Sequence, residues 1–302
     1  MIVLRCLVAM MGVLVLAARP LPAQTTAPTN QQPPPASEQN PTESQWQNYF
    51  RTLVGEYRMS VGKTGQPLTL VEKPVLKWSQ PVRGGQDGAV YLWVDEGRRP
   101  AAIGTFFIWP RQEDLMGVAH ELQRLSDAEI SGQWRDRIRW RPAKDSLVWQ
   151  SVPDAAVPDK NPSRRAIQAR EIARRFAATS VNRDQQKSEL RLQPRPFYQY
   201  DAADTDQLWL GGALCSIAHG TDTEVILWLE ARRSGDTFHW QYACARMSDL
   251  NLRVTLDDKE VWSADLANYD QQDSPYLSIT PEYLRQPPQA APPSSKEPNN
   301  PP

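Results

Sequence analysis

Residues 207–247 read QLWLGGALCSIAHGTDTEVILWLEARRSGDTFHWQYACARM, and this stretch contains three apolar runs separated by two turns. Both turns, at residues 219–222 and 233–236, have Gly and Asp where tight turns need them. Residues 224–231 are almost wholly apolar, which is typical of a strand covered on both faces, whereas residues 237–247 alternate with a period of two. The stretch therefore predicts an antiparallel meander.

Further strands and two helices are predicted on both sides of this meander. Spacings of three and four predict a short helix at residues 43–54 and a longer amphipathic helix at residues 163–179. No internal repeat is evident in the sequence. The predicted fold is α+β and β-rich, a curved antiparallel sheet or partly closed barrel with one long amphipathic helix and a short N-terminal helix. The further strands are predicted at residues 56–61, 74–78, 88–95, 101–109, 115–125, 189–193, 197–200, 252–256 and 260–263, with a hairpin of 135–140 and 146–152.

Both ends of the chain differ in composition from its middle. Residues 1–23 combine an early Arg, an apolar run too short to span a bilayer and a final small residue, which predicts a cleaved secretory signal. An uncleaved anchor is the alternative. Residues 24–43 and 286–302 are rich in Pro and polar residues, so we expect disordered segments there. We expect one globular domain at residues 44–285, periplasmic or extracellular, with no transmembrane segment after signal removal.

Net charge, tryptophan content and cysteine content bear on the partners, the core and the disulfide bonds of the protein. The net charge of −1 gives no basis for a strongly basic surface, so nucleic acid is not expected as a partner. Eleven Trp indicate either a large aromatic core or an exposed stacking surface. Beyond the signal, Cys215 and Cys244 lie in separate predicted strands. A disulfide between them can form if these strands are neighbours, and is out of reach if another strand lies between.

His120 and Glu121 are the first candidates for acid–base chemistry. Neighbours on a strand point to opposite faces, and Arg124 stands where a helical H-E-x-x-H zinc motif has its second His. Asp87 lies in the glycine-rich segment at residues 83–88, which lacks the Lys and Ser/Thr of a phosphate-binding loop and suits an ordinary tight turn. We therefore expect no metal and no other cofactor.

Arginines and tryptophans are the candidates for binding. One face of the second predicted helix carries several arginines, among them Arg170 and Arg174, which can form a docking face for anionic groups. A solvated polar face opposite an apolar stripe is the alternative. The flanking residues of Trp134, Trp140 and Trp149 leave their burial open, so these three are the candidates for an exposed aromatic patch.

Two resemblances add to these patterns. The segment LVGEYRM, at residues 53–59, resembles the start of lipocalin-like barrels, which implies a closing sheet and no particular ligand. The stretches WSQPVRGGQDGAVYLW, HELQRLS, TDTEVILWLEARR and YACARMSDLNLRV resemble those of a family of exported proteins from planctomycete-type bacteria without an assigned activity. This second resemblance implies an exported, autonomous domain and transfers no catalytic residue.

The sequence carries no catalytic, metal or cofactor signature, so it favours a non-catalytic binding or interaction domain of the cell envelope, with an unknown ligand or protein partner. One alternative is a secreted hydrolase whose site is assembled from Asp87, His120 and Glu121. Another alternative is a lipocalin-like carrier of an apolar small molecule. A pocket that gathers those three residues would favour the hydrolase, and an enclosed apolar cavity would favour the carrier.

Overall fold

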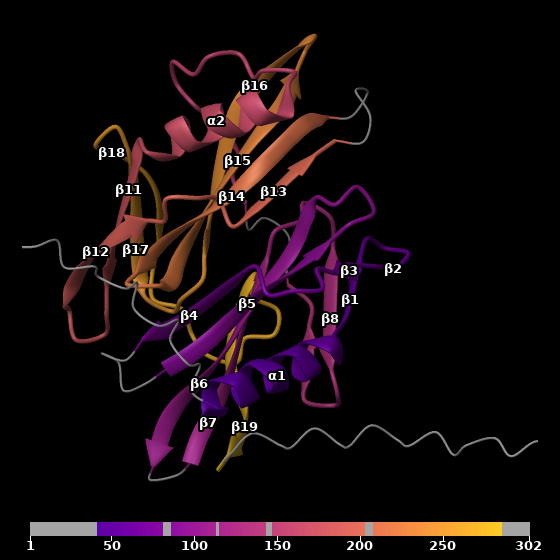
Figure 1. Ribbon diagram of the computed structural model, residues 1–302, viewed down its shortest axis with the longest axis vertical. Helices are drawn as coiled ribbons and strands as arrows, with labels where there is room; N and C mark the ends of the chain where they lie inside the picture. The colour runs from indigo at the N-terminus through magenta and orange to yellow at the C-terminus, as the bar shows by residue number, and fades with distance from the viewer. Residues whose placement is uncertain (1–40, 81–85, 113–114, 143–146, 203–207, 286–302) are drawn as a thin grey trace, which may run out of the picture. The chain divides into compact units, whose positions relative to one another are not determined.

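The first half of the chain, together with the C-terminal strand β19, forms a helix and two antiparallel sheets. The computed structural model describes residues 41–80, 86–112, 115–142, 147–202 and 208–285, which belong to one compact unit. One sheet has the order β19-β7-β6-β5-β3, with β4 also paired to β5, and a smaller sheet has the order β2-β1-β8-β9 (Figure 1). The elements are α1 (Pro41–Gly55), β1 (Arg58–Val61), β2 (Gln66–Pro67), β3 (Thr69–Leu70), β4 (Leu76–Gln80), β5 (Gln86–Val94), β6 (Pro100–Gln112), β7 (Leu115–Arg124), β8 (Ile130–Trp134), β9 (Ile138–Trp140) and β19 (Tyr276–Leu284).

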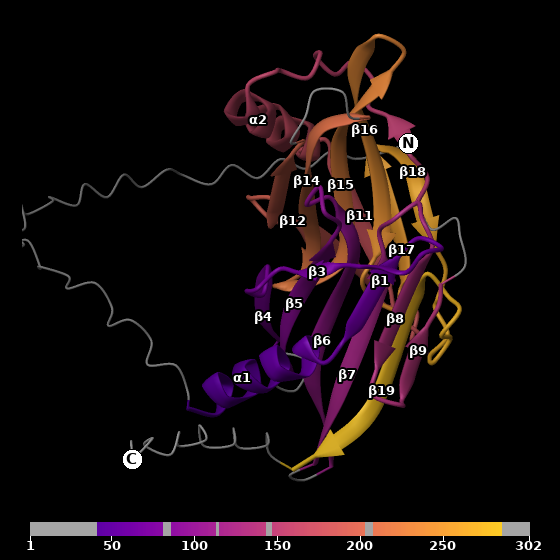
Figure 2. The same cartoon turned by 90° about the vertical axis from the view of Figure 1, so that its right-hand side faces the viewer.

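The second half contains one helix and one continuous antiparallel sheet. Its order is β10-β16-β15-β14-β12-β11-β17-β18, and β13 also pairs with β14. The sheet is curled (Figure 2), and its apolar side chains form one cluster with those of α2. The prediction of a β-rich fold built on a curved antiparallel sheet is therefore confirmed. The elements are β10 (Gln150–Ser151), α2 (Pro162–Ala173), β11 (Phe176–Val181), β12 (Lys187–Leu192), β13 (Tyr198–Asp201), β14 (Trp209–His219), β15 (Asp222–Ser234), β16 (Thr237–Arg246), β17 (Asn251–Leu256) and β18 (Lys259–Ala264).

The two halves repeat one arrangement of elements. Helix α1 precedes β1, β4, β5, β6, β7, β8 and β9, and α2 precedes β11, β13, β14, β15, β16, β17 and β18, with the same pairings among them. The bounds of β6 and β15 differ by 122 at both ends (222 − 100 and 234 − 112), as do those of β7 and β16 (237 − 115 and 246 − 124). We call residues 41–140 repeat 1 and residues 162–264 repeat 2. The structure thus contains an internal repeat that the sequence analysis did not find.

A short sequence motif marks the repeat at the ends of β7 and β16. Arg124 begins Arg-Leu-Ser-Asp, and Arg246 begins Arg-Met-Ser-Asp. The Nε of Arg124 donates to the carbonyl oxygen of Ser126 at 2.7 Å, and the Nε of Arg246 donates to that of Ser248 at 2.8 Å. Each arginine therefore satisfies backbone carbonyl groups of the loop that follows its strand, in the same way in both repeats.

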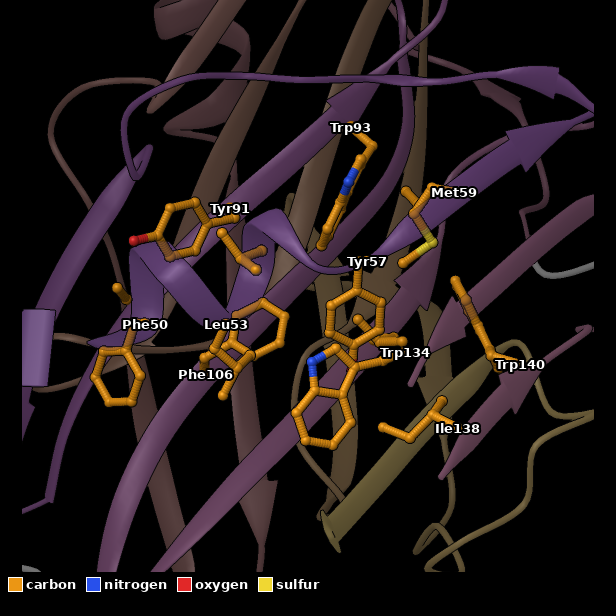
Figure 3. Packing of buried hydrophobic residues seen from close by; sticks show 14 of the residues in the cluster. Phe50, Leu53, Tyr57, Met59, Tyr91, Trp93, Phe106, Trp134, Ile138 and Trp140 are labelled. Carbon is orange, nitrogen blue, oxygen red and sulfur yellow. The ribbon is translucent and has the colours of Figure 1, made fainter. Parts of the chain in front are cut away.

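Three apolar clusters form the core. One includes Leu92 and Ile103 from the sheet of repeat 1, and Leu214 and Ile226 from the sheet of repeat 2, so it lies between the two large sheets. A second cluster includes side chains of α2 and of the curled sheet around it. The third lies under α1 and contains many aromatic side chains. Figure 3 labels its members Phe50, Leu53, Tyr57, Met59, Tyr91, Trp93, Phe106, Trp134, Ile138 and Trp140.

Two local predictions are wrong. Helix α2 ends at Ala173 and not near residue 179, because residues 176–181 alternate between buried and more exposed positions with a period of two and form β11. With 12 residues, α2 is shorter than the 15-residue α1, so the long helix is the N-terminal one. The predicted hairpin of residues 135–140 with 146–152 is replaced by pairing of β9 with β8, through a tighter turn that begins at Arg135 with φ +48°.

Candidate ligand pocket under the second helix

Helix α2 begins at a well-defined cap. Asn161 precedes the helix in an extended conformation, and its side-chain oxygen accepts hydrogen bonds from the backbone N–H groups of Ser163 at 2.9 Å and Arg164 at 3.3 Å. Pro162 follows the cap, where its missing N–H costs nothing. The cap fixes where the helix begins and so places Arg165 on its buried face.

Strand register allows the two helices to be compared position by position. Met59 pairs with Gly132 in repeat 1, and Ala178 pairs with Val254 in repeat 2. Because β8 and β17 differ by 122 (254 − 132), β1 and β11 differ by 119 (178 − 59). With the same offset, the buried Leu53 of α1 is equivalent to Ile172 of α2 (172 − 53), which is also buried.

Two large aromatic side chains of α1 have different counterparts in α2. Trp46 and Phe50 are 4% and 0% exposed and fill the space beneath α1 (Figure 3 shows Phe50). The positions 119 residues later are Arg165 (165 − 46) and Ala169 (169 − 50). Loss of a ring from a packed interior leaves a void unless the neighbours close around it. The space beneath α2 is therefore expected to be less completely filled.

A pocket of about 220 Å³ occupies this place in repeat 2. Arg165 and Ala169 line it from α2, Asp201 lines it from β13, and Trp240 lines it from β16. At ~30 Å³ per molecule, the pocket has room for roughly seven waters. Its size therefore suits one small organic molecule, either free or at the end of a longer chain.

A buried ion pair dominates the electrostatics of the pocket. The Arg165 side chain is 6% exposed, and its Nη2 donates to the carboxylate of Asp201. Its Nη1 donates to the backbone carbonyls of Asp159 at 2.8 Å and Lys160 at 3.1 Å. The Asp201 side chain is 51% exposed, so part of its carboxylate remains accessible. The two formal charges cancel, and the guanidinium already makes several of its hydrogen bonds within the protein.

Two aromatic residues, Trp240 and Tyr200, are also part of the pocket lining. Trp240 is 2% exposed, and its Nε1 has no hydrogen-bond partner among the described residues. Tyr200 packs over Gly212, where an added Cβ would lie 2.6 Å from the tyrosine Oη. The Tyr200 hydroxyl donates to Glu230, which Arg99 also binds at 2.8 Å. The Tyr200 ring belongs to the core between the two large sheets, and burial and the Glu230 charge raise its pKa, so its hydroxyl stays neutral.

His120 lies in the aromatic core of repeat 1. Its side chain is fully buried, its Nδ1 lies 2.7 Å from the Tyr57 hydroxyl, and its ring centroid lies 4.7 Å from that of Trp134. Burial, helped by the positive charge of Arg135, lowers the pKa of His120 to about 3. The imidazole is therefore neutral near pH 7 and packs as part of the core.

The structure does not bring Asp87, His120 and Glu121 together. His120 and Glu121 point to opposite faces of β7, and Glu121 accepts a hydrogen bond from Ser278 Oγ at 3.4 Å. Burial raises the pKa of Glu121, and nearby carboxylates add to the effect. Asp87 lies on β5, two strands from β7, which is about 10 Å across the sheet. Residues 83–85 of the predicted glycine-rich turn lie outside the described residues.

The expected exposed patch of Trp134, Trp140 and Trp149 does not form. Trp134 and Trp140 are both 0% exposed, because pairing of β8 with β1 and β9 turns them into the core under α1. Trp149 is half-buried, with its ring 5.0 Å from that of Trp228 and 4.3 Å from the Arg232 guanidinium. Of the three, only Trp149 keeps a partly accessible ring.

Arg170 in α2 and Arg174, which caps the end of this helix, are both exposed, as a docking face requires. They do not line the pocket that contains Arg165. They line a separate hollow of about 180 Å³ together with Pro194 and Cys215. Arg165 itself belongs to the arginines that the helical pattern assigns to the solvated face, yet it is buried.

Of the two alternatives left open for Cys215 and Cys244, the structure shows separate thiols and no disulfide. Both are buried free thiols, and Leu227 on β15 pairs with Cys215 on one side and with Cys244 on the other. One intervening strand puts the two cysteines about 10 Å apart, beyond the ~7 Å limit for a disulfide. Burial raises the pKa of each thiol to about 12, which keeps both unreactive in the folded protein.

The described residues form neither a metal-binding cluster nor a membrane-spanning helix. The described residues contain no group of three or more His, Cys, Asp or Glu side chains that could hold a metal ion. No helix among them is long and apolar enough to cross a membrane. Sequence reasoning missed Asp201 and Trp240 because their convergence depends on strand pairing. Aligning the two Arg-x-Ser-Asp motifs would have indicated the repeat, but their offset of 122 pairs Phe50 with Ile172, and the offset of 119 that pairs Phe50 with Ala169 needs the strand register.

Comparison with known proteins gives no further assignment. The chain matches no family model, no curated protein and no solved structure. The resemblance to exported planctomycete-type proteins therefore stays a prediction.

Proposed function

We propose that this chain is a non-catalytic, exported binding protein of the cell envelope that holds a small molecule in the pocket under α2. Repeat 1 acts as the packed partner, and repeat 2 carries the ligand. One observation carries the proposal. Phe50 fills the interior of repeat 1, and Ala169 leaves about 220 Å³ at the equivalent place in repeat 2.

The positions of the titratable candidates favour binding over hydrolysis. A hydrolase needs its acid, base or nucleophile within reach of one reacting atom. Asp87 is two strands from His120, and Glu121 faces away from it, so these three side chains share no cleft. His120 is also fully enclosed by core side chains.

The ion pair in the pocket favours a polar ligand over an apolar one. Pockets of apolar carriers are lined mainly by hydrophobic side chains. This pocket contains the Arg165–Asp201 pair, and the polar residues Ser163 and Gln199 also line it. An alkyl chain beside these groups would separate them from water without replacing their hydrogen bonds.

The experiment is to fill the pocket. In Ala169→Phe the new ring occupies the place of the ring of Phe50 in repeat 1, so the variant should fold and lose binding. The matched control is Ile167→Phe, because Ile167 is 47% exposed on the same helix. Saturation-transfer NMR is run on all three proteins with glucose, N-acetylglucosamine, glucuronate, phosphate and decanoate.

The proposal expects at least one of these probes to bind the wild type and the Ile167→Phe variant, and none to bind Ala169→Phe. Equal binding to Ala169→Phe and to the wild type would place the ligand elsewhere. Absence of binding by every probe to the wild type would also contradict the proposal.

A further inference from the structure

We infer that the ligand of the pocket under α2 is a neutral, polyhydroxylated molecule of about the size of one sugar ring. This inference rests on the proposed function and specifies the chemistry of its ligand. It follows from three properties of the lining, namely its charge, its hydrogen-bonding groups and its volume.

The charge of the lining favours a neutral ligand. Arg165 and Asp201 are the charged side chains that line the pocket, and they bind each other. The Arg165 guanidinium also donates to two backbone carbonyls, so it has little capacity left for an anionic ligand. An anion would meet the half-exposed carboxylate of Asp201, and a cation would compete with Arg165 for it.

The hydrogen-bonding groups require a ligand that both donates and accepts. A carboxylate has about four acceptor positions, so Asp201 keeps acceptor capacity after binding Arg165. Ser163 and Gln199 line the same space, and the side chains of these two residues can both donate and accept hydrogen bonds. A hydroxyl group of the ligand can donate to the carboxylate of Asp201 and accept from Ser163 or Gln199. Several hydroxyl groups on one small ring satisfy this mixed lining better than a single carbonyl or an alkyl chain.

The volume limits the ligand to one ring. The pocket of about 220 Å³ has room for roughly seven waters at ~30 Å³ each. A single pyranose ring with its hydroxyl groups fits such a space, whereas a disaccharide or a fatty acyl chain would extend out of it. A chain end or a free monosaccharide would present the same chemistry.

The test measures the affinity of the same five probes by isothermal titration calorimetry for the wild type and two asparagine variants. Asp201→Asn removes the acceptor charge and frees Arg165 from its partner, with almost no change in volume. Asp184→Asn is the control, because Asp184 is exposed in the turn between β11 and β12. We expect glucose or N-acetylglucosamine to bind the wild type and the control. In Asp201→Asn, neutral sugars should bind about tenfold more weakly, and glucuronate or phosphate should bind more tightly.

The outcomes separate this inference from the proposed function. If phosphate, glucuronate or decanoate binds the wild type and loses binding in Ala169→Phe while neutral sugars do not bind, the pocket stands and the ligand class is wrong. If neutral sugars bind Asp201→Asn as tightly as the wild type, the carboxylate plays no part and the inference is wrong. If no probe binds the wild type, both the inference and the proposed function are wrong.

Discussion

His120 is a fully buried histidine of repeat 1 whose hydrogen-bond partner is a tyrosine hydroxyl. His120 contacts Tyr57 through Nδ1 at 2.7 Å and packs against Phe106 and Trp134, with ring centroids 5.1 Å and 4.7 Å away. The position 122 residues later is Tyr242 (242 − 120), which packs on Phe176 at 5.0 Å. Repeat 2 thus has an aromatic pair where repeat 1 has a polar one. This comparison supports a packing role for His120.

Protonation of His120 gives a pH dependence of known sign. Its pKa is about 3 in the folded protein and 6.5 when unperturbed, so between these values the unfolded chain binds one more proton than the folded chain. The free energy of unfolding therefore falls as the pH falls from 6.5 towards 3, by at most about 1.4 kcal/mol per pH unit.

The prediction is that His120→Gln removes this contribution. Urea unfolding at pH 7 and pH 5 should show the wild type losing about 2 kcal/mol more than the variant. The exposed His239→Gln is the control and should behave as the wild type. Equal losses in His120→Gln and the wild type would show that His120 does not titrate in this way.

At the scale of elements, each repeat packs an aromatic ring of one strand over a glycine of its neighbour. Trp78 pairs with Gly88 in repeat 1, and Tyr200 pairs with Gly212 in repeat 2. A Cβ at Gly88 would lie 2.4 Å from the Trp78 ring, and one at Gly212 would lie 2.6 Å from the Tyr200 Oη. Both contacts are shorter than packed carbon atoms tolerate, so the ring or the strand must move to accept a methyl group.

We therefore predict that Gly88→Ala and Gly212→Ala each lower the free energy of unfolding by about 1–3 kcal/mol. Gly55→Ala is the control, because nothing lies within 4 Å of its added Cβ. Denaturant unfolding measures all three variants. If either of the first two variants is as stable as the control, the close packing of ring on glycine described for that repeat is wrong.

Strand positions could be predicted from the sequence, and their partners largely could not. Alternation in residues 237–247 needs only local sequence, and it predicted β16 closely. The burial of Trp134 and Trp140 depends on pairing of β8 with β1 and β9, which no local pattern indicates. Residues 176–179 follow either period, and the neighbouring strand β17 favours the extended form. The end of α2 was therefore missed for a tertiary reason.

At the scale of the whole described unit, two copies of one architecture have different interiors. Their sheets pack together through a shared apolar layer, so each supports the other. Under α1 the interior is filled by aromatic rings, and under α2 a pocket remains around the Arg165–Asp201 pair. One repeat can thus provide packing while the other provides binding. The sequence contained this contrast, as Phe50 against Ala169, but only the strand register aligns the two positions.

A high-resolution crystal structure of the wild-type protein tests this contrast most directly, through the electron density under each helix. The account predicts ordered water or a bound molecule within hydrogen-bonding distance of Asp201, and solid aromatic packing around Phe50. A helix α2 collapsed onto β13 and β14 with Arg165 in solvent, or a comparable hydrated space under α1, would contradict it.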